Sequence, residues 1–359
     1  MIKINKKIGV IERYADILPV TEKTPVITLL EGSTPLIKAD NIKKMLEVKF
    51  NIYLKYEGLN PTGSFKDRGM TVAVSKAVEK GAKAVICAST GNTSASASAY
   101  AVRAGIKSIV VIPDGAIALG KLSQALIHGA KVVAVRGNFD RCLELVREIC
   151  ENFDVELVNS VNPNRIEGQK TASYEIAEAL GDTPAYQFMP VGNAGNITAY
   201  WKGYKELNEK NGLELPVMMG FQAAGSAPIV EGKIVKDPKT VATAIKIGNP
   251  ASWEQAESAR DESDGIIDKV TDEEILKAWQ ELASKEGVFA EPASAASLAG
   301  LKKYLREDNF DPASVENVVC ILTGHGLKDP DRAVETVSRP PVIDDDIDKV
   351  VEAAGIQQS

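Results

Sequence analysis

Residues 84–103 read AVICASTGNTSASASAYAVR, and this stretch decides the class of fold. Its first five residues are apolar, which is typical of a short strand that is buried on both faces. Gly91 marks a turn directly after them, and the small residues from Thr93 onward favour a helix. Strand, glycine turn and helix in this order form the repeating unit of a parallel α/β sheet.

The same alternation continues on both sides of this unit. Apolar, β-branched runs predict strands at 52–56, 84–88, 108–113, 131–135, 155–158, 186–190, 217–222 and 317–322. Helical periodicity predicts helices at 64–80, 93–104, 120–127, 139–153, 166–180, 196–208, 272–285 and 293–305. Such connections require right-handed crossovers and a parallel sheet covered by helices on both faces.

Eight strands in a chain of 359 residues are enough for two α/β layers with a cleft between them. Periodicity alone does not show where the chain crosses from one layer to the other. The run PPVIDDDI at 340–347 is typical of a linker into a short amphipathic helix or tail.

Composition and charge exclude several classes of function. The chain is 44% hydrophobic and 25% charged, and its net charge is -7, so no overall basic field favours nucleic acid or an anionic membrane surface. No apolar run is long enough to span a membrane, and the charged N-terminus does not resemble a secretory signal. The four cysteines are scattered without a C-x-x-C pair, which indicates free thiols in a reducing cytoplasm.

The first chemical motif is NPTGSFKDRG at 60–69. Asn60, Pro61 and Gly63 predict a turn, with Ser64 as N-cap and Asp67 in a capping-box-like arrangement. Lys66 then lies in the first turn of a helix, where the helix dipole and desolvation lower an amine pKa and make it a better nucleophile toward an aldehyde. The alternative is a surface lysine with its head in water.

Two glycine turns follow apolar strands. In the first, Asn92 and Thr93 lie where ligands of α/β folds bind, although the small residues after them also permit plain helix–sheet packing. The second is VGNAGN at 191–196, where glycines permit positive φ and backbone amides can bind a phosphate ester. It matches neither the dinucleotide motif nor a P-loop, and an ordinary βα turn is the alternative.

The fourth motif is TGHG at 323–326, after the final apolar strand. The Thr323 hydroxyl is well placed to hydrogen-bond a ring nitrogen without charging it, or it caps a turn. With only two histidines, a His-based triad is nearly excluded, and no His/Cys pattern indicates a metal site.

These motifs, in this order, resemble the tryptophan-synthase-β, or fold type II, group of pyridoxal-phosphate enzymes. Within that group, NPTGSFKDRG, NSVNPNRIEGQKT at 159–171, IGNPAS at 247–252 and EPASAAS at 291–297 resemble the threonine synthases of the shorter bacterial and archaeal type. The resemblance covers nearly the whole chain. It implies two α/β domains with mostly parallel sheets and a cofactor cleft between them. We place the larger domain, which holds the cofactor phosphate, at 1–60 plus 156–340, the smaller at 61–155, and a C-terminal helix or tail at 341–359.

The resemblance also implies roles for individual residues. Lys66 carries pyridoxal 5'-phosphate as an internal aldimine and serves as the catalytic base, Asn92 binds the 3-hydroxyl, and Thr323 faces the pyridine nitrogen. The cofactor phosphate is held by the loop Gly192, Asn193, Ala194, Gly195 and Asn196. Many relatives have more glycine in this loop, and we expect the departure at Ala194 to be minor because alanine donates the same backbone N–H.

A second phosphate site follows from the 159–171 run. Arg165 lies at the head of a helix, where a guanidinium can clamp a phosphate bidentately, or it forms a surface ion pair. The resemblance implies that Thr93, Asn159, Ser160, Arg165 and Lys66 surround the phosphate of the substrate O-phospho-L-homoserine.

The implied reaction converts O-phospho-L-homoserine and water into L-threonine and phosphate. Threonine or serine dehydratase and cysteine synthase, which share the fold, are the alternatives, and a non-catalytic phosphate-binding protein is a more distant one. The Asp67-Arg68-Gly69 run and the Arg165 region favour a phosphorylated substrate. We further expect a cytoplasmic homodimer that binds no metal, nucleic acid or membrane.

Overall fold

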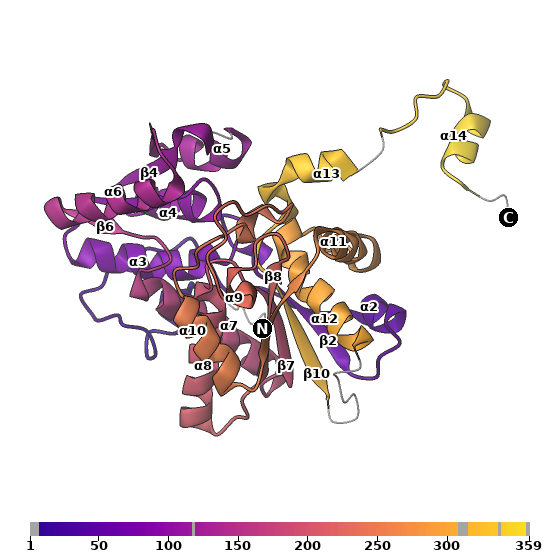
Figure 1. The fold of residues 1–359 in the computed structure, drawn as a ribbon, viewed down its shortest axis with the longest axis horizontal. Helices are drawn as coiled ribbons and strands as arrows, with labels where there is room; N and C mark the ends of the chain where they lie inside the picture. The colour runs from indigo at the N-terminus through magenta and orange to yellow at the C-terminus, as the bar shows by residue number, and fades with distance from the viewer. Residues whose placement is uncertain (1–6, 117–118, 308–314, 337–338, 357–359) are drawn as a thin grey trace, which may run out of the picture. The chain divides into compact units, whose positions relative to one another are not determined.

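The computed structural model describes residues 7–116, 119–307, 315–336 and 339–356. Residues 1–328 form one unit, in which the described strands make two sheets (Figure 1). The six-stranded sheet has the order β1-β2-β10-β7-β8-β9 and the four-stranded sheet the order β5-β4-β3-β6. The strands are β1 (Leu36–Lys38), β2 (Asn51–Tyr56), β3 (Ala84–Ala88), β4 (Lys107–Pro113), β5 (Lys131–Val135), β6 (Val155–Leu157), β7 (Tyr186–Pro190), β8 (Val217–Ala223), β9 (Ile266–Val270) and β10 (Asn317–Leu322).

Every strand pair in the two sheets is parallel except β1 with β2. This confirms the predicted α/β class with mostly parallel sheets. All eight predicted strands are present, whereas β1 and β9 were not predicted. The three residues of β1 are too few for a pattern, and the sequence of β9, IIDKV, carries two charges at the edge of the sheet.

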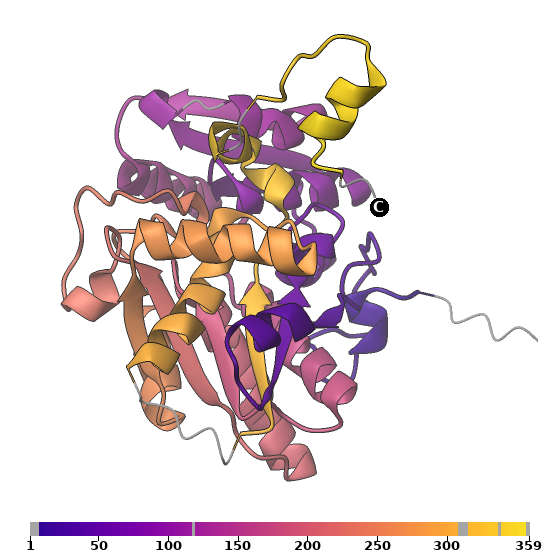
Figure 2. The same cartoon turned by 90° about the vertical axis from the view of Figure 1, so that its right-hand side faces the viewer.

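Helices cover both sheets. They are α1 (Val10–Arg13), α2 (Asp40–Met45), α3 (Lys66–Glu79), α4 (Asn92–Arg103), α5 (Leu119–Ile127), α6 (Phe139–Asn152), α7 (Pro163–Leu180), α8 (Gly195–Asn211), α9 (Pro228–Glu231), α10 (Trp253–Glu262), α11 (Asp272–Glu286) and α12 (Ala296–Arg306). Figure 2 shows α11 and α12 in front of the six-stranded sheet, while a core built around α7 and α8 lies on its other face. The polar sequence of α10, WEQAESARDE, explains why its helix was not predicted.

Two helices carry the chain between the sheets. α3 follows β2 of the six-stranded sheet and packs into the core of β3 and β4, and α7 follows β6 and packs against α8. The two helices approach closely, because a Cβ at Gly69 would lie 2.6 Å from the Arg165 carbonyl oxygen and one at Gly168 only 2.0 Å from that of Arg68. Since β6 pairs with β3, the smaller sheet extends to Leu157. The exact division into two domains stays a prediction.

Residues 329–359 form a second unit. Its described helices are α13 (Pro330–Thr336) and α14 (Ile347–Ala353). The Asp346 carboxylate caps α14 by accepting from the backbone N–H groups of Asp348 and Lys349 at 3.0 and 3.1 Å. The helix therefore begins directly after the acidic run that we predicted to be a linker.

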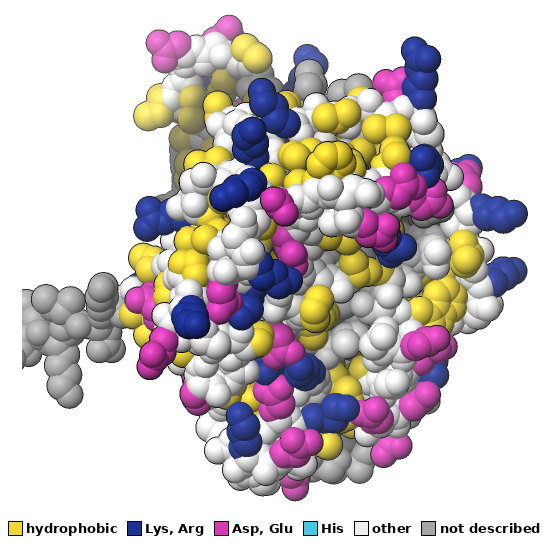
Figure 3. All heavy atoms as spheres, turned by 90° about the vertical axis from the view of Figure 1, so that its left-hand side faces the viewer, with side chains coloured by type: hydrophobic (Ala, Val, Ile, Leu, Met, Phe, Trp, Pro, Cys, Tyr) yellow, Lys and Arg dark blue, Asp and Glu magenta, His cyan; other side chains and the backbone are white. Residues whose placement is uncertain are grey.

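The surface carries mixed charge. On the face shown in Figure 3, acidic and basic side chains are interspersed, as the moderate net charge of -7 leads one to expect. Within the described ranges, no helix is both long and apolar enough to cross a membrane.

Candidate active site

Backbone contacts bring the Lys66 motif against the Thr323 motif. The N–H of Phe65 donates to the Thr323 carbonyl at 3.0 Å, and the N–H of His325 donates to the Gly63 carbonyl at 2.9 Å. Lys66 lies in the first turn of α3, as predicted, and Thr323 directly follows β10. The two motifs are more than 250 residues apart in the sequence, and these two hydrogen bonds therefore hold their turns side by side.

Asn92 and Thr323 both contact Glu291, a residue for which we predicted no role. The Asn92 amide Nδ2 donates to Glu291 Oε2 at 3.0 Å, and the Thr323 hydroxyl donates to Glu291 Oε1 at 3.0 Å. Asn92 begins α4 after β3 of the smaller sheet, whereas Thr323 follows β10 of the larger one. The polar groups that meet here thus come from both sheets.

The loop at 192–196 is held by two other segments. Asn193 Nδ2 donates to the Ser160 hydroxyl, and Asn193 Oδ1 accepts from the Ala251 N–H at 2.7 Å. The Ser252 N–H donates to the Asn193 carbonyl at 3.3 Å. Ser160 and the IGNPAS run therefore both support the loop, a role for that run that the sequence did not reveal.

The prediction that glycines supply positive φ in this loop is wrong. The left-handed residue is Ala194, with φ 65°, which for a residue with a Cβ costs about 1–2 kcal/mol. Gly192 is required for close packing instead, because a Cβ there would lie 2.9 Å from Ile245 Cα. Alanine at 194 is thus not the minor departure that we expected, since its backbone conformation is one that favours glycine.

The loop fits a phosphate. It opens α8, a 17-residue helix whose first turn presents backbone N–H groups and the positive end of the helix dipole. Asn196, in that turn, is buried, and neither its Nδ2 nor its Oδ1 has a hydrogen-bond partner within the described chain. A buried amide with both polar atoms unsatisfied is expected to have a ligand. The site therefore suits the phosphate of pyridoxal 5'-phosphate.

Lys66 has the electrostatics of a reactive amine. Burial holds its pKa well below the usual lysine range, and the Arg165 charge acts in the same direction, while Glu291 opposes them. The predicted direction of the shift is confirmed. Lys66 Nζ lies 3.7 Å from the centroid of the Phe65 ring, and the side chain is only partly exposed. The alternative of a lysine with its head in bulk water does not hold.

Arg165 is an unpaired guanidinium inside the protein. Arg165 is 1% exposed, and its Nη1 donates to the Val158 carbonyl at 3.3 Å. Within the described residues, Nε has no hydrogen-bond partner and Arg165 forms no ion pair with a carboxylate. Burial lowers its pKa to about 10. The alternative of a surface ion pair does not hold, and a buried cation without an anion is expected to receive one.

Two further residues, Asn159 and Thr93, were predicted to contact the substrate, and their surroundings differ. The Asn159 side chain accepts from the Ala88 N–H at 2.9 Å and donates to the Ala88 carbonyl at 3.0 Å, so it holds the end of β3. The Thr93 hydroxyl, in the first turn of α4, makes no hydrogen bond to the part of the chain that is described. Contact of either residue with substrate stays a prediction.

The predicted capping box at the start of α3 is wrong. The N-cap is Phe65, and the Asp67 carboxylate accepts from the Thr62 N–H at 2.7 Å, the Thr62 hydroxyl at 2.6 Å and the Ser96 hydroxyl at 2.6 Å. Burial raises the pKa of Asp67 to about 6 against these hydrogen bonds. Asp67 thus ties the Lys66 turn to α4.

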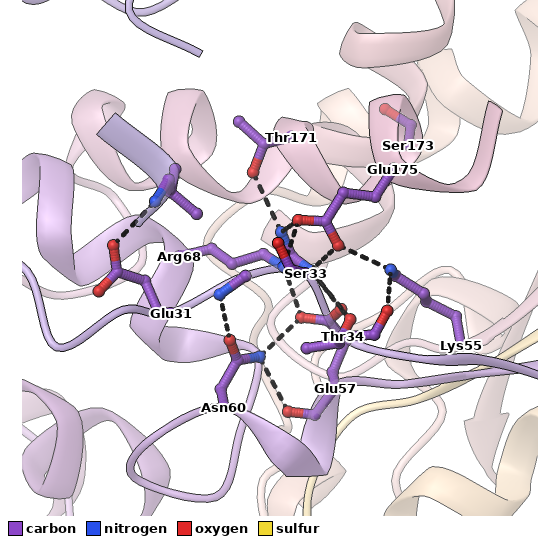
Figure 4. Close-up of polar contacts among 12 residues, drawn as sticks. Glu31, Ser33, Thr34, Lys55, Glu57, Asn60, Arg68, Thr171, Ser173 and Glu175 are labelled. Atoms are coloured by element: carbon purple, nitrogen blue, oxygen red, sulfur yellow. Dashed lines mark hydrogen bonds and ion pairs between the residues drawn. The ribbon is translucent and has the colours of Figure 1, made fainter. Parts of the chain in front are cut away.

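Arg68 is the centre of a buried ionic cluster (Figure 4). Its guanidinium donates to both carboxylate oxygens of Glu57 at 2.6 and 2.8 Å and to both of Glu175 at 2.8 and 2.6 Å. Lys55 Nζ adds a second cation at 2.7 Å from Glu175. Arg68 and Asp67 are therefore engaged in the protein interior, and the argument that they favour a phosphorylated substrate fails. Among the motif residues, only Arg165 still supports it.

Comparisons with known proteins identify the family of this chain. Residues 27–324 match the family described as pyridoxal-phosphate dependent enzyme. A protein of Halalkalibacterium halodurans named threonine synthase is 58% identical over 93% of this chain and 94% of its own. One of Synechocystis, also named threonine synthase, is 61% identical over 91% of this chain and 85% of its own. The structure of maize serine racemase has a TM-score of 0.74 at 21% identity over 88% of this chain and 94% of its own, which shows the fold alone.

The fold and the family match over residues 27–324 define a pyridoxal-phosphate-dependent enzyme of fold type II, and the lysine at the head of α3 and the loop at the head of α8 fit that class. The match to relatives named threonine synthase covers more than nine-tenths of the chain and identifies the family within this class. The chain belongs to the threonine synthase family.

Proposed function

We propose that this chain converts O-phospho-L-homoserine and water into L-threonine and phosphate, the reaction of its family, with Lys66 at the reacting carbons and Arg165 on the substrate phosphate. The observation that carries the proposal is the buried, unpaired guanidinium of Arg165, whose charge acts on Lys66. The amides and Asn196 at the head of α8 belong to a different helix and suit a second phosphate. Two phosphates, one from the cofactor and one from the substrate, are what this reaction requires.

The protein residues bind, orient and move protons. Pyridoxal phosphate, when bound, supplies an electron sink for the carbon skeleton of the substrate. The loop at 192–196 would hold its phosphate, and Lys66 would hold its aldehyde carbon. Asn92 and Thr323 would meet the ring. Lys66 would then move the proton at the substrate α-carbon, a task for which a lowered amine pKa is required near neutral pH.

Arg165→Ala is expected to weaken the binding of phosphohomoserine by about 2–5 kcal/mol. It should change cofactor affinity little, because we assign the cofactor phosphate to the head of α8. The pKa of Lys66 should rise when the Arg165 charge is removed, so the acid limb of the rate profile should move to higher pH. Steady-state KM and a cofactor titration, both across pH, measure these effects. Arg165→Lys, which keeps the charge but loses the fork, is the matched control. Equal losses for cofactor and substrate would mean that Arg165 binds the other phosphate.

The direct test of the function measures two products. Incubation of the cofactor-loaded protein with O-phospho-L-homoserine should release phosphate and threonine in equal amounts. Incubation with threonine or serine should yield keto acid much more slowly. Faster keto acid formation from threonine than phosphate release would instead indicate a dehydratase.

We also propose that the enzyme acts as a homodimer in the cytoplasm. Twofold dimers are the commonest assemblies of soluble enzymes, and the four cysteines are free thiols, as expected in a reducing compartment. Light scattering on the purified protein gives the mass that tests the dimer.

A further inference from the structure

Glu291 is a buried carboxyl group to which neither the family motifs nor the proposed reaction gives a role. It is 4% exposed and lies directly before the short helix Pro292–Ala295. A Cβ at Gly324 would lie 2.5 Å from Glu291 Cδ, so glycine at 324 leaves room for this side chain. Its position is therefore built into the turn that follows Thr323.

Both oxygens of Glu291 are met by donors. Asn92 Nδ2 lies 3.0 Å from Oε2 and 3.3 Å from Oε1, and the Thr323 hydroxyl lies 3.0 Å from Oε1. Glu291 forms no ion pair with a described cation, although the charges of Lys66 and Lys328 favour its ionised form. Burial opposes them and raises its pKa. An environment of donors is what an acceptor-only carboxylate requires.

The Thr323 hydroxyl has one hydrogen to give. Ser294 Oγ lies 3.1 Å from Thr323 Oγ1, and Ser294 Oγ also accepts from the Gly324 N–H at 3.1 Å. The Ser294 hydrogen can therefore go to Thr323 or to the Gly324 carbonyl at 3.3 Å. When Thr323 gives its hydrogen to Glu291, its oxygen presents only lone pairs to any third group.

We propose that Glu291 is a positioning residue which, by accepting the Thr323 hydrogen, makes Thr323 an acceptor toward the cofactor ring nitrogen and so favours the protonated nitrogen. The proposal rests on the proposed function, since it takes Thr323 to face that nitrogen. It reverses the expectation that a hydroxyl here leaves the nitrogen uncharged. Asn92, which shares the same carboxylate, would be oriented by it as well.

Glu291→Gln separates this role from simple packing. Asn92 places a donor opposite Oε2, so the new amide is expected to turn its oxygen there and its nitrogen toward Thr323. Thr323 then accepts from the glutamine and has its hydrogen free for the ring nitrogen. Pyridoxal phosphate with a ¹⁵N-labelled ring nitrogen, bound to the full protein, reports the protonation of that nitrogen by NMR.

The wild-type protein should give the resonance of a protonated nitrogen, and Glu291→Gln should shift it toward that of the neutral nitrogen. The cofactor Kd should rise by no more than about tenfold, because one hydrogen bond is exchanged. Ser294→Ala, which leaves the Thr323–Glu291 bond in place, is the matched control and should retain the wild-type resonance. Thr323→Val, which removes the hydroxyl, should shift the resonance in the same direction as Glu291→Gln and serves if that variant does not fold.

An unshifted resonance in a folded Glu291→Gln protein, or in Thr323→Val, would overturn the proposal. So would a neutral nitrogen in the wild-type protein. A wild-type protein that fails to bind the cofactor covalently would instead contradict the proposed function, and the two failures are therefore distinguishable.

Discussion

Lys66→Ala is expected to lower kcat at least about 10³-fold, because the variant loses both the covalent anchor of the cofactor and the base at the reacting carbon. The fold should persist, since the Lys66 amine donates no hydrogen bond to the described chain and α3 is held through Asp67 and Arg68. The cofactor can still bind through its phosphate. Turnover at saturating cofactor and the thermal midpoint are the two measurements.

Lys80→Ala is a suitable control, because Lys80 ends the same helix and pairs with Glu156 at the surface. It should leave turnover unchanged. If Lys66→Ala keeps more than roughly a few per cent of the wild-type kcat, Lys66 has neither role.

Arg68→Met is expected to lower the free energy of unfolding by about 3–5 kcal/mol, because it leaves Glu57 and Glu175 buried with only Lys55 to compensate them. Urea denaturation at neutral pH measures this loss. Arg141→Met is the matched control: Arg141 pairs with Glu144 and Glu148 on the surface, and its loss should cost under about 1 kcal/mol. Equal losses in the two variants would show that the cluster does not stabilise the fold.

The same cluster predicts a pH dependence. Burial works to raise the pKa values of Glu57 and Glu175, but the Arg68 charge outweighs it and both pKa values are lowered. A carboxyl whose folded pKa is lowered contributes stability above its unfolded pKa, here 4.5, and loses it as the pH falls. Wild-type stability should therefore decline below about pH 4.5, and Arg68→Met should show a smaller decline.

How far each strand could be predicted depended on whether its sequence is an apolar run. β3, β7 and β10 have the predicted bounds because each is a short apolar run inside a sheet. β9 lies at an edge, where Asp268 and Lys269 are tolerated, so its sequence has no apolar run to detect. The capping prediction at α3 failed because Asp67 accepts from Thr62 and also from Ser96, and Ser96 belongs to α4, which the local sequence does not include.

The site divides in the same way. Lys66, Asn92 and Thr323 follow strand ends, where position along the chain already indicates a ligand site. Glu291 could not be given a role, because its contact with Asn92 spans 199 residues and exists only when both sheets are assembled. The resemblance identified the EPASAAS run as a family motif, but it did not indicate which groups the Glu291 carboxylate contacts. Arg165 was predicted as a phosphate ligand, and its burial adds a physical reason that the sequence alone did not contain.

The most direct test of the central claim, that Lys66 carries the cofactor in this site, is borohydride reduction of the pyridoxal-phosphate-loaded protein followed by peptide mapping. We predict that the label is fixed on Lys66 and on no other lysine, and that added O-phospho-L-homoserine before reduction prevents the labelling by displacing the amine. Label on another lysine, or label on Lys66 that phosphohomoserine does not prevent, would contradict the account.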